Sequence, residues 1–263
     1  MPGAAADWQG ATVQHGGLGL NADPHGPFHG PLAHAYACGA HIQVAGGGEW
    51  NNPVGCACCG PEQKRAGLYE DWGIGSPDDW RRQTESLIGD RDSNFAASVL
   101  LELRRVSSQA VGQPIDPGVW RDGIAHMCWQ HGIDEASYRQ WVDLARLILS
   151  YEERFTADGL LPPGAIVPSI KAWDFGRGAN MARWGVQCGY SDMHTSQTYA
   201  VHASEQARRH YATWAEFSAS YILGRCLHFD NGEFGHWYTT PLDVHHLMMS
   251  HPQSPWLHVP FRG

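Results

Sequence analysis

Polar side chains, two of them arginines that could hold an anion, recur every three residues in the segment 172–184. These are Asp174, Arg177, Asn180 and Arg183. Residues three apart are neighbours on the surface of an α-helix, so the spacing predicts one continuous polar stripe. The two arginines could grip a carboxylate or phosphate bidentately, with Asn180 fixing its orientation. Asp174 could orient an arginine or act as a general base.

The stripe also has a purely structural interpretation. An Asp–Arg pair beside a tryptophan often locks helices together, and the sequence leaves both interpretations open. Gly176 and Gly178 lie in the same segment. A glycine inside a helix costs roughly 1 kcal/mol relative to alanine, so these two indicate close approach by another helix or by a ligand.

Other constellations point less clearly to chemistry. Cys56, Cys58 and Cys59 have no second pair at the spacing of a structural zinc site. His245 and His246 would point about 100° apart on a helix, which does not suit one metal ion. The chain also lacks a nucleophile elbow and a phosphate-binding loop. No metal site is predicted, and no cofactor is identified.

The stripe belongs to one of several segments with helical periodicity, which together cover most of the chain. No alternating pattern typical of a β-strand occurs. The corners repeat one device: a glycine suited to a left-handed C-cap, an aliphatic residue, then a Ser or Asp that caps the next helix. It occurs over residues 73–76 and 132–134, and in a longer form from Gly185 to Asp192. We therefore predict an all-α fold, a compact multi-helix array with tight Gly-capped corners, with helices at 61–72, 77–88, 93–111, 117–130, 135–155, 172–188, 193–211, 214–229 and 241–250.

Composition limits the class of protein. The chain has 263 residues, of which 43% are hydrophobic and 17% charged, as in globular proteins. Residues 1–30 are rich in Gly, Pro and His and predict an irregular arm, and residues 31–263 predict a single helical domain. A net charge of −9 disfavours nucleic acid, and no apolar stretch reaches the roughly 18–20 residues of a membrane span. Seven cysteines, an odd number, and a start without a secretory signal predict a cytoplasmic protein.

The segment 174–185 (DFGRGANMARWG), followed by Gly189-Tyr190, resembles the hallmark of a bacterial family catalogued as domain of unknown function 1266. The resemblance continues in 211–217 (YATWAEF), 221–225 (YILGR) and 254–256 (SPW), and is weakest before residue 60. It implies a bacterial helical protein and no particular activity. It also implies that the four residues of the stripe are a shared feature of the family. The many histidines and the Gly/Pro-rich arm depart from the family pattern.

Three functions remain open. The stripe, together with tryptophans expected to be exposed (Trp8, Trp237 and Trp256), favours a module that binds a small anionic ligand or a protein partner. An enzyme acting on a small anionic substrate is the alternative, with the stripe's arginines as clamps and Tyr190 or Tyr221 at the edge of the pocket. A third alternative is an effector or immunity-type protein in bacterial competition. The sequence leaves open whether the chain is an enzyme and what its oligomeric state is.

Overall fold

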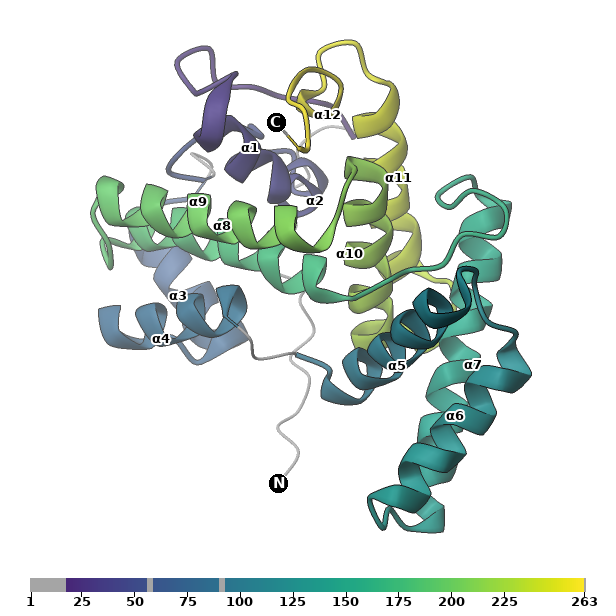
Figure 1. Ribbon diagram of the computed structural model, residues 1–263. Coiled ribbons are helices and arrows are strands. Elements are labelled where there is room, and N and C mark those ends of the chain that lie inside the picture. Colours follow the sequence, from purple (N-terminus) through teal and green to yellow (C-terminus); the bar gives the residue numbers. More distant parts are fainter. Residues whose placement is uncertain (1–17, 56–58, 90–92, 263) are drawn as a thin grey trace. The chain divides into compact units, whose positions relative to one another are not determined.

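The computed structural model describes residues 18–55, 59–89 and 93–262 (Figure 1). Within these ranges it contains twelve α-helices, and its only β-structure is an isolated bridge between Asn21 and Glu49, so the all-α prediction is confirmed. The helices are α1 (Gly30–Cys38), α2 (Ala40–Ala45), α3 (Pro61–Trp72), α4 (Pro77–Ile88), α5 (Phe95–Val111), α6 (Pro117–Gln130), α7 (Glu135–Ala157), α8 (Lys171–Cys188), α9 (Met193–His210), α10 (Trp214–Phe229), α11 (His236–Ser250) and α12 (Pro255–His258).

The chain divides into two compact units, each built from separate stretches of sequence. Unit 1 comprises Met1–Arg91, Asp174–Arg209 and Asp243–Gly263, and unit 2 comprises Asp92–Trp173 and His210–Leu242. The single domain predicted for residues 31–263 stays a prediction. Of the predicted arm, residues 18–29 are described and contain no helix, whereas residues 1–17, with Trp8, lie outside the described residues.

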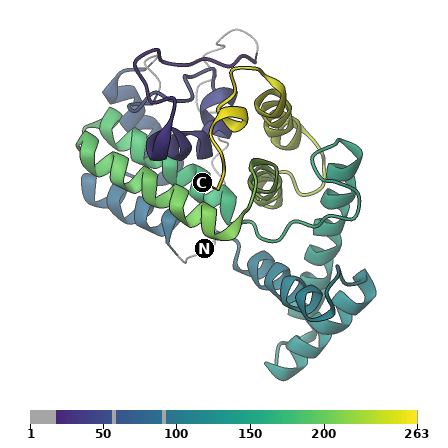
Figure 2. The same ribbon diagram turned by 45° about the horizontal axis from the view of Figure 1, so that its top comes forward.

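The part of α8 that belongs to unit 1 is a central helix, buried over nearly its whole length. α9 runs alongside it in both views of the ribbon, and Ser196 Oγ of α9 donates to the Ala182 carbonyl at 2.7 Å (Figures 1 and 2). Small residues allow the close approach of α4. A Cβ on Gly178 would lie 2.9 Å from Ile88, and a Cβ on Gly185 would lie 2.3 Å from the Trp80 ring. At Gly178, one of the two glycines singled out from the sequence, the expected close approach is thus by another helix.

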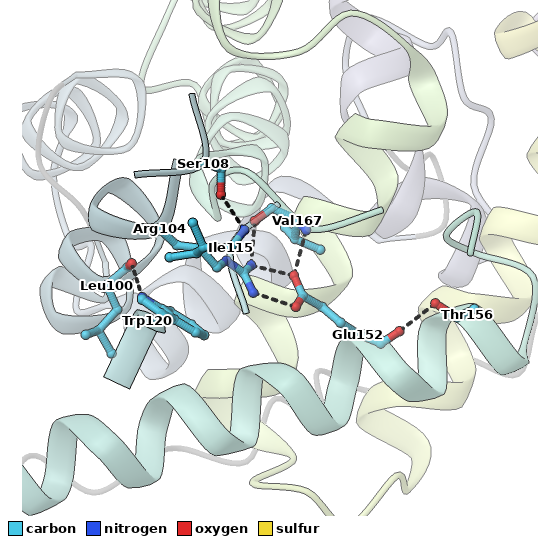
Figure 3. Close-up of polar contacts among 8 residues, drawn as sticks. All are labelled: Leu100, Arg104, Ser108, Ile115, Trp120, Glu152, Thr156 and Val167. Atoms are coloured by element: carbon cyan, nitrogen blue, oxygen red, sulfur yellow. Dashed lines mark hydrogen bonds and ion pairs between the residues drawn. The ribbon is translucent and has the colours of Figure 1, made fainter. Parts of the chain in front are cut away.

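A buried ion pair organises unit 2 (Figure 3). Arg104 of α5 donates from Nη1 and Nη2 to the two carboxylate oxygens of Glu152 of α7, at 2.7 and 2.6 Å. The same pair holds the connector after α7, because Val167 N donates to Glu152 at 2.6 Å and Val167 O accepts from Arg104 at 3.2 Å. The Arg104 guanidinium lies 4.4 Å from the centre of the Trp120 ring. The connector after α7 is therefore tied to both α5 and α7.

The predicted corners are confirmed in their chemistry. Gly73 and Gly132 take φ of 67° and 63°, in the left-handed region that favours glycine. Ser76 accepts from Asp79 N, and Asp134 accepts from Ser137 N, as N-caps of the following helices. In the third corner the left-handed residue is Gly189, with φ of 70°, while Gly185 lies inside α8.

Two expectations are wrong. α11 begins at His236 rather than at Pro241, which lies inside the helix. A proline has no N–H to donate to the residue four positions earlier, and that carbonyl, of Trp237, instead accepts from Arg225 Nε at 3.3 Å. Trp256 is buried rather than exposed, and its indole N–H donates to the Ala37 carbonyl at 3.2 Å.

Candidate functional site

The predicted stripe lies on α8, but its four side chains form two separate sets. The first is an ion pair in which Arg177 Nη2 donates to Asp174 Oδ1, with Asp174 buried. The Arg177 guanidinium also lies 5.4 Å from the centre of the Trp72 ring. This arrangement matches the structural interpretation of the stripe for these two residues. That Asp174 acts as a base, and that Arg177 binds a ligand, stay predictions.

The second set begins with Asn180, whose side chain is fully buried. Its Nδ2 donates to the Gly39 and Gly176 carbonyls, both at 2.9 Å. A Cβ on residue 39 would lie 2.6 Å from that Nδ2, so only glycine allows this contact between the α1–α2 link and α8. Asn180 Oδ1 is buried and has no hydrogen-bond partner in the described part of the chain.

Arg183 lies one turn further along α8 and is also fully buried. Its Nη2 donates to the Trp50 carbonyl at 2.8 Å, and its guanidinium lies 4.2 Å from the centre of the Tyr36 ring. Nε and Nη1 are buried without a hydrogen-bond partner, and none of the described carboxylates pairs with the guanidinium. Burial lowers the pKa of Arg183 to about 9, which leaves it charged at neutral pH.

The groups around Arg183 do not supply the missing negative charge. Burial raises the pKa of the Tyr36 hydroxyl, more strongly than Arg183 and Gln197 lower it. The Gln197 side chain lies near the Tyr36 hydroxyl and lowers its pKa, but among the described residues the hydroxyl has no hydrogen-bond partner of suitable geometry. Burial also raises the pKa of the Cys38 thiol far above its usual range. Both groups are therefore neutral at pH 7.

Tyr36, Gly39, Asn180 and Arg183 form what we call the Arg183 cluster. Tyr36 and Gly39 are three positions apart, as are Asn180 and Arg183. Tyr36 contacts Arg183 and Gly39 contacts Asn180, so the first pair, at the C-terminal end of α1, lies against the second pair on α8. Among the described residues, the cluster presents two donor nitrogens, one amide oxygen and one hydroxyl without a hydrogen-bond partner. Buried polar groups are normally hydrogen-bonded, and leaving one without a partner costs about 1–3 kcal/mol. These atoms could form hydrogen bonds to a polar group supplied from outside the described residues.

A family model described as "Protein of unknown function (DUF1266)" matches residues 67–261. The chain belongs to this family. In the chain, the DUF1266 region contributes Asn180 and Arg183 to the cluster, whereas Tyr36 and Gly39 precede the matched residues. No curated protein and no solved structure matches the chain.

Tyr190, the fifth predicted site residue, lies beyond the end of α8. Its ring is 6.0 Å from the Arg65 guanidinium, and Arg65 Nε donates to the Cys188 carbonyl at 2.7 Å. Tyr190 packs against a hydrophobic cluster that includes Leu68 and Trp80. The contacts of the described residues do not join Tyr190 to the Arg183 cluster, and its role in ligand binding stays a prediction.

The other candidates from the sequence give no further site. Cys56 and Cys58 lie outside the described residues, and Cys59 Sγ accepts from Gln187 Nε2 at 3.3 Å. His245 is buried and His246 is exposed. Among the described residues, no group of three or more His, Cys, Asp or Glu side chains could hold a metal ion. No helix there is both long and apolar enough to cross a membrane.

Tyr36, Gly39 and Trp50 were not identified from the sequence. They precede Arg183 by more than 130 positions and carry no motif of their own. The local signal available was Gly39 itself, a small residue between two short helices, and such glycines are common at helix ends.

Proposed function

We propose that this member of the DUF1266 family is a binding protein for a small anionic ligand, which it holds at the Arg183 cluster. One observation carries the proposal. The Arg183 guanidinium is fully buried and charged, and its Nε and Nη1 have no hydrogen-bond partner among the described residues. An isolated buried charge is strongly unfavourable unless an opposite charge or hydrogen-bonding groups compensate it. An anion bound to Nε and Nη1 would provide both.

A second buried arginine in the same chain shows how the protein compensates such a charge elsewhere. Arg104 is as deeply buried as Arg183, and Glu152 neutralises it bidentately. Arg183 has a backbone carbonyl and an aromatic face instead. The contrast supports a role for Arg183 in which the negative charge comes from outside the chain.

The same surroundings favour binding over catalysis. A general base must be able to accept a proton near neutral pH. Burial raises the pKa of both the Tyr36 hydroxyl and the Cys38 thiol, so neither ionises in that range. Asp174 is engaged with Arg177. Among the described contacts of Arg183, neither Tyr36 nor Cys38 therefore supplies a general base.

The proposal is tested by thermal unfolding of the full chain with increasing acetate or inorganic phosphate at constant ionic strength. A ligand that binds the folded state stabilises it by about 2.7 kcal/mol at a hundred times its Kd, so we expect the melting temperature to rise with at least one anion. Arg183→Met should abolish this rise. Arg209→Met, at an exposed position on α9, should leave it intact.

The Arg183→Met variant provides a second readout without ligand. Removing an uncompensated buried charge should keep or raise the melting temperature in anion-free buffer. An anion response equal in wild type and Arg183→Met, or none in wild type, would contradict the proposal.

A further inference from the structure

The orientation of the Asn180 amide restricts what the Arg183 cluster can bind. Nδ2 lies 2.9 Å from two carbonyl oxygens, those of Gly39 and Gly176. Turning the amide over would place Oδ1 against both carbonyls, acceptor facing acceptor, so the orientation is fixed. Within the described part of the chain, Oδ1 is therefore a buried acceptor without a donor, about one helical turn from the donors of Arg183.

A ligand that satisfies the unpartnered atoms of the cluster must therefore carry both a hydrogen-bond acceptor and a hydrogen-bond donor. Arg183 Nε and Nη1 require an acceptor, best a carboxylate, while Asn180 Oδ1 requires a donor. Residues three apart on a helix have Cβ atoms roughly 5–6 Å apart, so a single small ligand that reaches both side chains would carry the two groups close together. A carboxylate with a donor on the adjacent carbon meets this requirement in a small molecule.

The charge of the cluster decides between a hydroxyl and an ammonium donor. An ammonium group on Asn180 Oδ1 would lie beside the buried Arg183 guanidinium, with no carboxylate of the described chain to offset the repulsion. A hydroxyl donates without adding charge. The Tyr36 hydroxyl can either donate to the ligand or accept from it.

We propose that the ligand of the Arg183 cluster is a small 2-hydroxy carboxylic acid, with its carboxylate on Arg183 and its hydroxyl donating to Asn180 Oδ1. This inference rests on the proposed function and specifies the ligand class.

Titration calorimetry of the full chain with glycolate, acetate and glycine, at one pH and ionic strength, tests it. Glycolate should bind about ten-fold or more tightly than acetate, which leaves Asn180 Oδ1 unpaired, and glycine should bind more weakly than glycolate. Equal affinity for glycolate and acetate would overturn the hydroxy-acid assignment while leaving the proposed function standing. Tighter binding of glycine would also overturn it. Absence of binding by all three, together with no response to phosphate, would overturn both.

Substitution of Asn180, whose Oδ1 is the proposed acceptor, provides an independent test of the hydroxy-acid assignment. Asn180→Ala should reduce the glycolate preference to about equal affinity for glycolate and acetate. Gln187→Ala, two turns further along α8, should retain the wild-type preference. If Asn180→Ala is folded by circular dichroism and keeps the preference, the assignment is wrong. If it does not fold, the wild-type comparison of glycolate with acetate still decides.

Discussion

The buried ion pair of unit 2 allows a quantitative test of how burial determines the contribution of an arginine to the free energy of unfolding. The Arg104 and Glu152 side chains are 3% and 7% exposed and bond through both carboxylate oxygens. Arg104→Met leaves the carboxylate with the Val167 amide as its remaining partner in this network. Glu152→Gln keeps the size of the side chain but leaves the guanidinium without a counter-ion.

The expected losses follow from these contacts. Removing one partner of a buried pair costs about 3–5 kcal/mol, so each single variant should lose that much. In the double variant Arg104→Met/Glu152→Gln no charge remains, and the glutamine oxygen can still accept from Val167 N. The lost bond to Val167 O costs about 1 kcal/mol and one unpaired amide N–H about 1–2 kcal/mol. We therefore expect a loss of about 2–3 kcal/mol, well below the sum of the single losses.

Native-state hydrogen exchange, followed by mass spectrometry on peptides from α5 and α7, measures these losses locally. A single denaturation midpoint is less suitable, because two compact units need not unfold together. Arg105→Met is the matched control. Arg105 pairs with Glu102 at 2.7 and 2.6 Å on the same helix, but the side chains are 37% and 58% exposed, so the loss should be about 0–1 kcal/mol. Equal losses for Arg104→Met and Arg105→Met, or additive losses in the double variant, would refute the reasoning.

Two further predictions concern glycine packing and buried histidines. Gly185→Ala should lower the melting temperature, at a cost of about 1–3 kcal/mol, because its Cβ would lie 2.3 Å from the Trp80 ring. Gly123→Ala, where the nearest atom would be at an ordinary 3.7 Å, should instead stabilise by about 0.5–1 kcal/mol, and a loss there of similar size would contradict the packing argument. Burial lowers the pKa of His34 and of His245 from 6.5 to about 4. Between these pH values the histidines are protonated in the unfolded chain but neutral in the folded one, so the free energy of unfolding should fall as pH drops from 6.5 towards 4. Urea titrations across this range should show a loss of up to about 3 kcal/mol per histidine, reduced in His34→Gln and His245→Gln, and an unchanged pH dependence in both variants would count against this assignment.

Local signals predicted the helices whose ends carry a cap. α3 and α4 lie at the predicted residues because Pro61, Gly73 and Ser76 mark their ends in the sequence. The sequence predicts too short a helix for α11, because a proline is typical of a helix start and Pro241 lies inside α11. The carbonyl of Trp237, which Pro241 cannot bond, accepts instead from Arg225, a tertiary contact that the local sequence does not show. α1 was not delimited, because most of its residues are buried and no polar face marks its period.

The candidate site was predictable only as far as one helix determines it. Spacing alone identified the Asp174–Arg177 pair, since both partners lie on α8. The burial of Arg183 depends on Tyr36 and on Trp50, which is 133 positions away, and neither periodicity nor charge connects them in the sequence. A polar stripe therefore predicted where chemistry could occur, but not which members would be left without partners.

The discontinuous make-up of unit 1 has a consequence for how the chain matures on the ribosome. His34 contacts the Phe261 carbonyl across 227 positions, and Trp256 donates to the Ala37 carbonyl across 219. Both stretches of unit 2 have been synthesised at residue 242, whereas the third stretch of unit 1, Asp243–Gly263, has not. Contacts between distant segments form slowly and leave apolar surface exposed in the meantime. We therefore expect nascent α1, which these contacts bury, to keep apolar surface exposed until residue 261 has been synthesised.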